Sequence, residues 1–263
     1  MDNSIRTKVN TFMFIPLLLV ITILYPNRTC IAKEKENYPK LLKIYKYNNS
    51  IFTQGLELKK SNSELFFSSG LYGKSFVGKI DLKSGIVKKK RLKKSIFAEG
   101  LTVTNKKIWL LTWQEGKVFI LNEKNFKMTK VIRYNGIGWG IANDGKKIFL
   151  SNGTNEISIR NKNTFLEEKR LRVVDTDNTD VYDLNELECA SGYIYANKWH
   201  SNYIYKINKF TGQVIKKYNC SKIINKENVI QKENVLNGIA HLSKNTFLIT
   251  GKRWSHIYKV ILN

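Results

Sequence analysis

Five short segments of similar sequence recur along this chain of 263 residues, and this internal repeat limits the fold more than any other feature. In four of the five, a polar or aromatic residue is followed by glycine and then by leucine or isoleucine. The segments are Gln54-Gly55-Leu56, Glu99-Gly100-Leu101, Trp139-Gly140-Ile141, Asn185-Glu186-Leu187 and Asn237-Gly238-Ile239, which start 40 to 52 residues apart. Self-similarity at such a period is typical of a repeat architecture in which each repeat is one supersecondary unit.

Strand-like runs follow each of these starts in the same order. In the second repeat, a first strand to about Val103 and a polar turn at residues 105–107 precede a second strand at 108–113, and a third strand covers 118–121. These runs are rich in β-branched and aromatic residues and are short, as strands are. Four short strands per repeat at this period predict a blade of a β-propeller. We therefore expect an all-β fold, a five-bladed β-propeller, rather than an open sandwich of unrelated strands.

The two ends of the chain are predicted to complete one blade together. The fifth repeat ends after its third strand, at Asn263, while the strand-like run Lys40–Tyr47 precedes the first repeat. That run can supply the missing strand, which closes the ring and removes two exposed sheet edges. The propeller then forms one domain, residues 34–263.

Residues 1–33 have the features of a targeting segment. Arg6 and Lys8 precede an apolar run at residues 12–25, which is short for a membrane span and fits the apolar region of a signal peptide. Because no clear cleavage site follows, both a cleaved signal peptide and an uncleaved signal anchor in the membrane stay open. In either case we expect the chain in the secretory pathway, in a lumenal or extracellular compartment.

The formal net charge of +24 raises the question of an anionic partner. Lys and Asn are spread through turns and strand ends, and even the densest run, Lys88–Lys94, lies in a predicted strand and its exit. No nucleic-acid-binding motif accompanies the charge, so we attribute it to composition and expect no nucleic acid as a partner. Cys189 and Cys220 have the wrong spacing for a zinc site, and the sequence leaves open whether they form a disulfide.

The propeller brings distant residues to one place, because the first strand of every blade lines the central channel. The five repeat starts should meet at one mouth of the channel: Gln54, Glu99, Trp139, Asn185 and Asn237. Aromatic side chains and a lysine should surround them: Phe52, Phe97, Trp113, Trp199 and Lys252. A carboxylate among amides and aromatic walls is typical of a small-molecule or chain-end site. A single glutamate at a strand start usually faces solvent, but this setting indicates a functional Glu99.

The ordered set of motifs resembles the plant and bacterial type of glutaminyl-peptide cyclotransferase, a family of five-bladed propellers. The matching sequence segments are Phe52-Thr53-Gln54-Gly55-Leu56, Ala98-Glu99-Gly100-Leu101-Thr102, Leu111-Thr112-Trp113, Gly138-Trp139-Gly140, Ser151-Asn152-Gly153-Thr154, Asn185-Glu186-Leu187-Glu188, Ala196-Asn197-Lys198-Trp199, Leu236-Asn237-Gly238-Ile239-Ala240 and Gly251-Lys252-Arg253-Trp254. The chain departs from the family in its Lys/Asn-rich turns, its N-terminal segment and an insertion at 225–234, and none of these is expected to touch the matched pocket positions.

The resemblance implies an enzyme that converts N-terminal glutamine into pyroglutamate and releases ammonia. It implies Glu99 as the acid/base group and the following residues as the substrate pocket: Phe52, Gln54, Phe97, Trp113, Trp139, Asn185, Trp199 and Lys252. The enzyme's substrates are then peptides or proteins with N-terminal glutamine. We further expect a monomer, and the reaction itself requires no metal or other cofactor.

Two other functions stay open on the sequence. A calcium-dependent propeller hydrolase would use Glu99, Asn185 and Asn237 as oxygen ligands, but aromatic residues crowd the same mouth and Ca²⁺ usually takes six or more oxygens. A non-catalytic propeller that docks a protein partner would instead present apolar rims.

Overall fold

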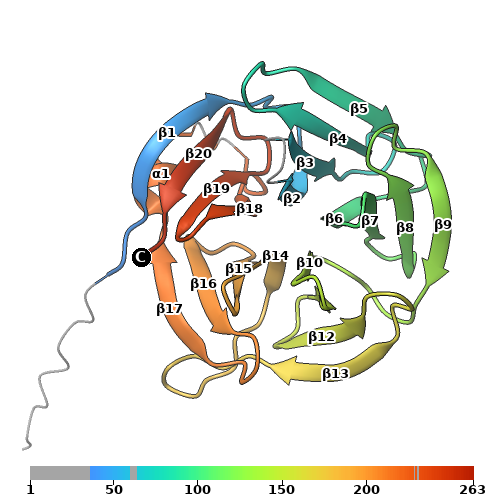
Figure 1. Ribbon diagram of the computed structural model, residues 1–263. Helices are drawn as coiled ribbons and strands as arrows, with labels where there is room; N and C mark the ends of the chain where they lie inside the picture. The colour runs from blue at the N-terminus through green and yellow to red at the C-terminus, as the bar shows by residue number, and fades with distance from the viewer. Residues whose placement is uncertain (1–35, 60–63, 228, 230) are drawn as a thin grey trace, which may run out of the picture. The chain divides into compact units, whose positions relative to one another are not determined.

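Five antiparallel sheets of four strands each are arranged around a common centre in the computed structural model (Figure 1). The model describes residues 36–263 apart from 60–63, 228 and 230, and residues 36–263 form one compact unit. The prediction of an all-β, five-bladed β-propeller is confirmed. The predicted targeting segment and the domain boundary after residue 33 lie outside the described residues.

Each blade has four strands that run from the channel outward in chain order, except the last. The first blade contains β2 Thr53–Lys59, β3 Glu64–Ser69, β4 Phe76–Asp81 and β5 Val87–Arg91. The second contains β6 Ala98–Thr104, β7 Lys107–Thr112, β8 Lys117–Asn122 and β9 Met128–Arg133. The third contains β10 Ile141–Asn143, β11 Lys147–Leu150, β12 Glu156–Asn161 and β13 Glu167–Arg172. The fourth contains β14 Leu184–Ala190, β15 Tyr193–Lys198, β16 Tyr203–Asn208 and β17 Val214–Asn219, followed by the short helix α1 Ser221–Ile224. The fifth contains β18 Leu236–Ser243, β19 Thr246–Gly251, β20 His256–Ile261 and the N-terminal strand β1 Lys40–Lys46.

The fifth blade joins the two ends of the chain, as predicted. β1 pairs antiparallel with β20, with Ile44 opposite Tyr258 and Lys46 opposite His256 (Figure 1). Just after β1, the N–H of Tyr47 donates a hydrogen bond of 2.7 Å to the carbonyl of Ser255. β1 therefore covers the edge that β20 would otherwise expose.

The hydrophobic core lies between neighbouring blades, because both faces of a blade are covered. In β3, Phe67 packs in a cluster with Leu248 of the fifth blade, whereas Phe66 packs in another with Leu110 of the second blade. Successive side chains of a strand point to opposite faces, so the apolar run Leu65-Phe66-Phe67 serves both interfaces. Phe66 and Phe67 are both fully buried.

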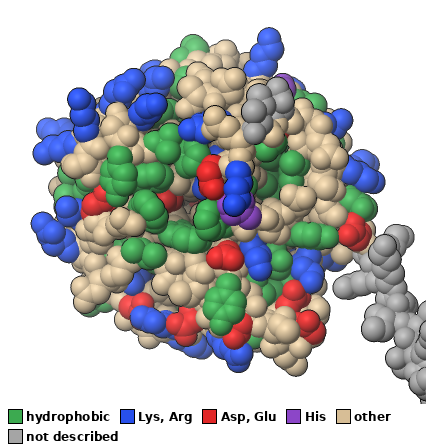
Figure 2. Space-filling model, turned by 180° about the vertical axis from the view of Figure 1, so that it is seen from behind, with side chains coloured by type: hydrophobic (Ala, Val, Ile, Leu, Met, Phe, Trp, Pro, Cys, Tyr) green, Lys and Arg blue, Asp and Glu red, His purple; other side chains and the backbone are tan. Residues whose placement is uncertain are grey.

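The basic residues are distributed as the sequence indicated. All five residues of β5, including Lys88, Lys89 and Lys90, are exposed on an outer strand. Figure 2 shows Lys and Arg side chains spread around the edge of one face of the protein, and hydrophobic side chains nearer its middle. Within the described residues, no helix is both long and apolar enough to cross a membrane.

Cys189 and Cys220 are both free cysteines. Cys189 lies in β14, whereas Cys220 follows β17, and two strands of the same sheet separate them. Three strand spacings of about 4.8 Å each far exceed the roughly 4.4–6.8 Å between the Cα atoms of a disulfide. The fold therefore answers the question that the sequence left open, and these two residues do not pair.

Candidate active site

A β-bulge sets the direction of the Glu99 side chain. In the second blade Ala98 pairs with Thr112 and Leu101 pairs with Leu110, so two residues, Glu99 and Gly100, stand opposite one. Bulges re-aim side chains next to active sites. The ladder shifts at the equivalent places in the first, fourth and fifth blades, between Thr53 and Gly55, Leu184 and Leu187, and Leu236 and Ile239. The same irregularity thus directs several repeat starts towards the channel mouth.

A hairpin turn fixes the other end of the strand that carries Glu99. Asn105 and Lys106 have φ values of 50° and 60°, and positive φ at both central residues is what a two-residue type I′ hairpin requires. The turn was predicted at 105–107, and the structure confirms it with the difference that Lys107 already belongs to β7.

All nine predicted site residues line one cavity of about 240 Å³. The residues that surround it are Phe52, Gln54, Leu71, Phe97, Glu99, Trp113, Trp139, Asn185, Trp199, Glu233 and Lys252. Pockets for drug-sized ligands usually have roughly 300–1,000 Å³, so this cavity suits a single amino-acid residue at a chain end. Trp139 lies two residues before β10 rather than in a strand, but its N–H still bonds the carbonyl of Ser151 at 2.9 Å.

Asn237, the fifth repeat start, does not line the cavity. It is buried, and its Nδ2 donates to the carbonyl of Thr53 at 2.9 Å and to Oε1 of Gln54 at 3.3 Å. Asn237 therefore fixes the position of Gln54, which does line the cavity, through its side-chain nitrogen.

Aromatic rings form two walls of the cavity. Trp139 and Trp199 meet edge to face with ring centroids 5.9 Å apart, and Phe97 and Trp113 lie 5.3 Å apart. Gly153 makes room for the Trp139 indole: it has a φ of 83°, and a Cβ there would lie 2.6 Å from the ring. In the Asn-Gly-Thr motif at 152–154, packing against Trp139 thus explains the glycine.

Glu99 is a buried carboxyl group with 4% of its surface exposed. Its Oε1 accepts a hydrogen bond of 3.1 Å from Nε2 of Gln54. Burial raises the pKa of Glu99 well above its ordinary value, Lys252 opposes this rise, and the neighbouring carboxylate of Glu115 adds to it. Glu99 therefore holds a proton at a higher pH than an ordinary carboxyl group does.

Lys252 provides the positive charge of the cavity. Its Nζ lies over the ring of Phe52, 5.0 Å from the centroid, and the residue is 4% exposed. Burial lowers the pKa of Lys252, while Glu99 and Glu233 act in the opposite direction. The cation–π contact with Phe52 and the electrostatic attraction of the two carboxyl groups thus oppose the loss of the Lys252 proton.

Asn185 and Trp199 differ in whether their polar side-chain atom already has a hydrogen-bond partner. Oδ1 of Asn185 is buried and has no hydrogen-bond partner among the described residues. In contrast, Nε1 of Trp199 donates to Oε2 of Glu233 at 3.3 Å. A buried acceptor without a partner costs free energy, so Asn185 is prepared to accept a hydrogen bond from a ligand.

Leu71 and Glu233 also line the cavity, and the sequence pattern indicated neither of them. Leu71 has a φ of 88° and follows β3 by two residues, and nothing in its sequence distinguishes it from a core leucine. Glu233 belongs to the insertion at 225–234, which we expected not to touch the matched pocket positions. That expectation was wrong, because Glu233 bonds Trp199 and also lies 3.3 Å from Nε2 of His200.

The described residues contain no group of three or more His, Cys, Asp or Glu side chains arranged to hold a metal ion. Glu99 has Gln54 and Lys252 as its neighbours, and Asn237 turns its amide nitrogen to its partners. Of the three oxygen ligands that a calcium site was expected to use, Glu99 and Asn185 line the cavity and Asn237 does not.

Comparisons with known proteins agree with this geometry. The family model for glutamine cyclotransferase matches residues 16–262. A glutaminyl-peptide cyclotransferase from Arabidopsis thaliana is 33% identical over 225 residues, which are 83% of this chain and 69% of the relative. The crystal structure of a glutaminyl cyclase from Myxococcus xanthus matches with a TM-score of 0.80 and 30% identity over 87% of this chain and 97% of its own. A luciferin-regenerating enzyme, with a TM-score of 0.55 and 10% identity over 85% of this chain and 95% of its own, shares the fold alone.

Proposed function

The chain belongs to the glutamine cyclotransferase family, and on that premise we propose that it is a glutaminyl-peptide cyclotransferase, which converts the N-terminal glutamine of peptides or proteins into pyroglutamate and releases ammonia. One observation carries the assignment beyond the family level: all nine residues that the sequence predicted for the site surround one cavity, with Glu99 buried in it.

The cavity is suited to bring the two ends of a glutamine together. The aliphatic part of the side chain would lie between the aromatic walls, and the α-amine would meet Glu99. The amine and the carboxamide belong to the same residue, so ring closure is intramolecular and mainly needs orientation, which is worth a large part of the barrier. The walls of Trp139, Trp199, Phe97 and Trp113 supply that orientation and exclude water.

Glu99 would transfer the protons. Its carboxylate takes a proton from the substrate's α-ammonium, which leaves a neutral amine that attacks the side-chain carboxamide carbon. As the new C–N bond forms and the old one breaks, the nitrogen that attacks loses a second proton. The leaving NH2 group takes one of the two protons and departs as ammonia, and Glu99 releases the other proton to water. A raised pKa suits both directions of transfer, because general acid/base catalysis works best when the pKa lies near the operating pH.

Lys252 and Asn185 would hold the polar atoms of the substrate. The carboxamide oxygen gains negative charge during the attack, and the buried ammonium of Lys252 is the cation of the cavity that can stabilise it. Oδ1 of Asn185 has no hydrogen-bond partner among the described residues and would accept an N–H of the substrate. The residues of the cavity match the chemistry of a calcium-dependent hydrolase or of a binding module less well than they match cyclisation.

The direct test is an assay of the purified full chain on a peptide that begins with glutamine, with ammonia release and the mass of the product as readouts. We expect ammonia and a pyroglutamyl peptide in equal amounts. A peptide with the same sequence behind an N-terminal asparagine should not react at a comparable rate, because its ring would be one atom smaller. Failure to release ammonia from any glutamine peptide would contradict the proposal.

We also propose that the protein acts as a monomer in the secretory pathway, in a lumenal or extracellular compartment. The support is the pattern of basic residues and an apolar run at residues 12–25. Protease protection of the enzyme in intact vesicles would test the compartment, and carbonate extraction would distinguish a membrane anchor from a cleaved signal. Full digestion without detergent would contradict this location.

A further inference from the structure

The half-buried part of the cavity lining carries a single charged residue, Glu233. Six of the residues around the cavity are buried, whereas five are half-buried and therefore lie nearer to solvent, at its mouth. These five are Leu71, Trp113, Trp139, Trp199 and Glu233. Four of them are aliphatic or aromatic, and Glu233 has 45% of its side chain exposed. A substrate chain that leaves the cavity therefore passes a carboxylate.

The backbone next to Glu233 is fixed to the fifth blade by hydrogen bonds. The carbonyl of Asn234 accepts Nε1 of Trp254 at 2.9 Å, and the Asn234 residue is buried. The carbonyl of Val235 accepts the N–H of Lys252 at 2.9 Å. The Glu233 side chain therefore starts from a backbone with a defined position beside the cavity.

Two ring nitrogens hold the Glu233 carboxylate against the aromatic wall. Nε1 of Trp199 donates to Oε2 at 3.3 Å, and Nε2 of His200 lies 3.3 Å from Oε1. The Trp199 and His200 rings have centroids 4.4 Å apart, so both lie on the same side of the carboxylate. An ionised carboxylate has about four acceptor sites. Glu233 can therefore accept further hydrogen bonds from its exposed side.

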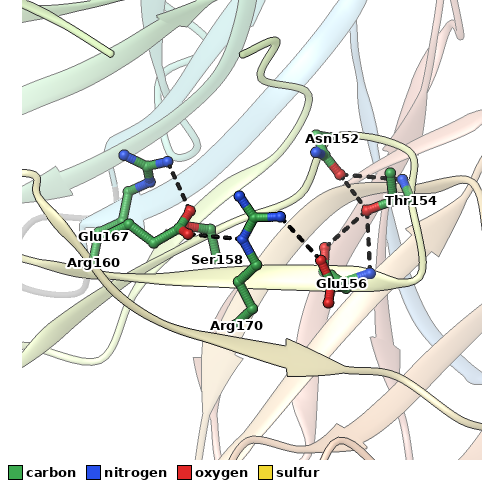
Figure 3. A network of polar contacts seen from close by, with 7 residues as sticks. All are labelled: Asn152, Thr154, Glu156, Ser158, Arg160, Glu167 and Arg170. Atoms are coloured by element: carbon green, nitrogen blue, oxygen red, sulfur yellow. Dashed lines mark hydrogen bonds and ion pairs between the residues drawn. The ribbon is translucent and has the colours of Figure 1, made fainter. Parts of the chain in front are cut away.

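Carboxylates at another cavity of this protein are paired with arginine, and Glu233 is not. Figure 3 shows Glu167 between Arg160 and Arg170, at distances of 3.2 and 2.7 Å. Arg170 also binds Glu156 at 3.2 Å. Among the described residues, Glu233 forms no salt bridge with a lysine or arginine, although the chain has a net charge of +24. Its charge is thus available to a cation that arrives with the substrate.

We propose that Glu233 is a specificity-determining residue, which favours substrates whose second residue is lysine or arginine. This role rests on the proposed function, because it requires the N-terminal glutamine to fill the cavity. The cavity of about 240 Å³ suits a single residue, so the second residue of the substrate lies at the mouth, beside Glu233. A basic side chain there gains a charge-assisted hydrogen bond, whereas an acidic side chain is repelled.

Nearby positive groups make a comparison between peptides necessary. Burial lowers the pKa of Lys252, and Glu99 and Glu233 oppose this fall. The guanidinium of Arg253 lies over the ring of Phe52, 5.1 Å from its centroid. Removal of the Glu233 charge thus also acts on Lys252, and through it on every substrate. That effect is shared by peptides that differ only at their second residue, so the ratio of their rates isolates the charge selection.

The test uses three peptides of one sequence that begin with glutamine and have lysine, glutamine or glutamate as the second residue. At low ionic strength, where exposed charges are screened least, the wild type should cyclise the lysine peptide with the highest kcat/KM and the glutamate peptide with the lowest. The ratio of these two values should fall about two- to fivefold in Glu233→Gln and further in Glu233→Lys. Gln keeps an oxygen that can accept Nε1 of Trp199, so the aromatic wall is retained.

Glu168→Gln is the matched control, because it removes the same charge from an exposed glutamate of the third blade and should leave the ratio unchanged. A ratio in Glu233→Gln equal to that of the wild type would overturn the proposal, and so would an equal loss for all three peptides, which would assign Glu233 a purely structural role. If neither variant folds, the preference of the wild type for the lysine peptide must weaken as salt is added, and a preference that resists salt would contradict charge selection.

A binding measurement separates this proposal from the proposed reaction. If none of the three peptides releases ammonia, the cyclisation fails, and isothermal titration calorimetry with the same peptides then decides the role of Glu233. The ratio of the two Kd values, for the glutamate and the lysine peptide, is compared between Glu99→Gln and the double variant Glu99→Gln, Glu233→Gln. We expect the same two- to fivefold fall, about as large as for other exposed ion pairs. Equal ratios, or no binding of any peptide, would refute the selection by Glu233.

Discussion

Gln54 donates a hydrogen bond from Nε2 to Oε1 of Glu99 over 3.1 Å, and this bond joins the first blade to the second at the channel mouth. Asn237 of the fifth blade fixes the orientation of the Gln54 amide. Nδ2 of Asn237 donates to Oε1 of Gln54, so the amide nitrogen of Gln54 faces Glu99. Three blades thus hold a single carboxyl group in place. A group that is positioned this way needs little reorganisation during the reaction.

Replacing Glu99 with Gln is expected to abolish cyclisation while the fold persists. Gln has the shape of Glu but cannot carry a proton, and general acid/base help is typically worth ~10²–10⁴-fold. The measurement is kcat/KM on a glutamine peptide, with circular dichroism as the check of the fold. Glu123→Gln is the matched control, because Glu123 is equally buried but pairs with Lys59 away from the pocket and should keep its rate. A Glu99→Gln variant with more than about a tenth of the wild-type rate would rule out the acid/base role.

The same variant should become relatively more stable as the pH rises. Glu99 has a folded-state pKa above its unfolded value. The stability from a group of this kind is complete below the unfolded pKa, about 4.3, and is lost as the pH rises through the folded pKa. Glu99→Gln has no such loss, so its Tm minus that of the wild type should increase with pH. Melting curves from about pH 4 to pH 9 would show this, and a difference that falls with pH would mean that ionised Glu99 stabilises the fold.

Glu186 is predicted to stabilise the ring rather than to act on the substrate. It stands where the other four repeats have glycine, and its two oxygens accept the N–H groups of Leu56 at 3.2 Å and Ile239 at 2.8 Å. Glu186→Gln replaces one acceptor by a donor, which leaves a buried N–H unpaired at a cost of about 1–3 kcal/mol. Chemical denaturation should show this loss, whereas the exposed Glu168→Gln should not. A large loss of kcat without a loss of stability would assign Glu186 to the reaction instead.

The ring also depends on β1. A chain that begins at Asn48 lacks β1, so β20 becomes an open edge that invites edge-to-edge association. We expect this chain to aggregate and to melt at lower temperature than one that begins at Glu36, with size-exclusion chromatography and thermal melting as the measurements. If the shorter chain stays monomeric and has the same Tm, the strand is not needed for closure.

The repeat pattern predicted the fold and brought four of the five repeat starts to the cavity, because propeller symmetry carries positions 40 to 52 residues apart to one mouth. The fifth start, Asn237, was expected there as well but does not line the cavity. The positions of Leu71 and Glu233 at the cavity could not be predicted in this way. Both lie in loops outside the repeated strands, and loops do not follow the period. The role of Glu186 also depends on geometry, because only the folded ring shows which N–H groups of other blades its side chain reaches.

The last prediction concerns metal ions. In the proposed reaction Glu99 must be free to meet the ammonium group of the substrate, so a cation bound there would compete with the substrate. Activity should therefore survive prolonged dialysis against EDTA and should not rise when Ca²⁺ or Zn²⁺ is added. A calcium-dependent hydrolase requires the opposite, because the ion itself is the Lewis acid of its reaction. Dialysis followed by assay of glutamine-peptide cyclisation, with and without added Ca²⁺, separates the two. Loss of activity on chelation that Ca²⁺ restores would refute the mechanism built on Glu99 and Lys252.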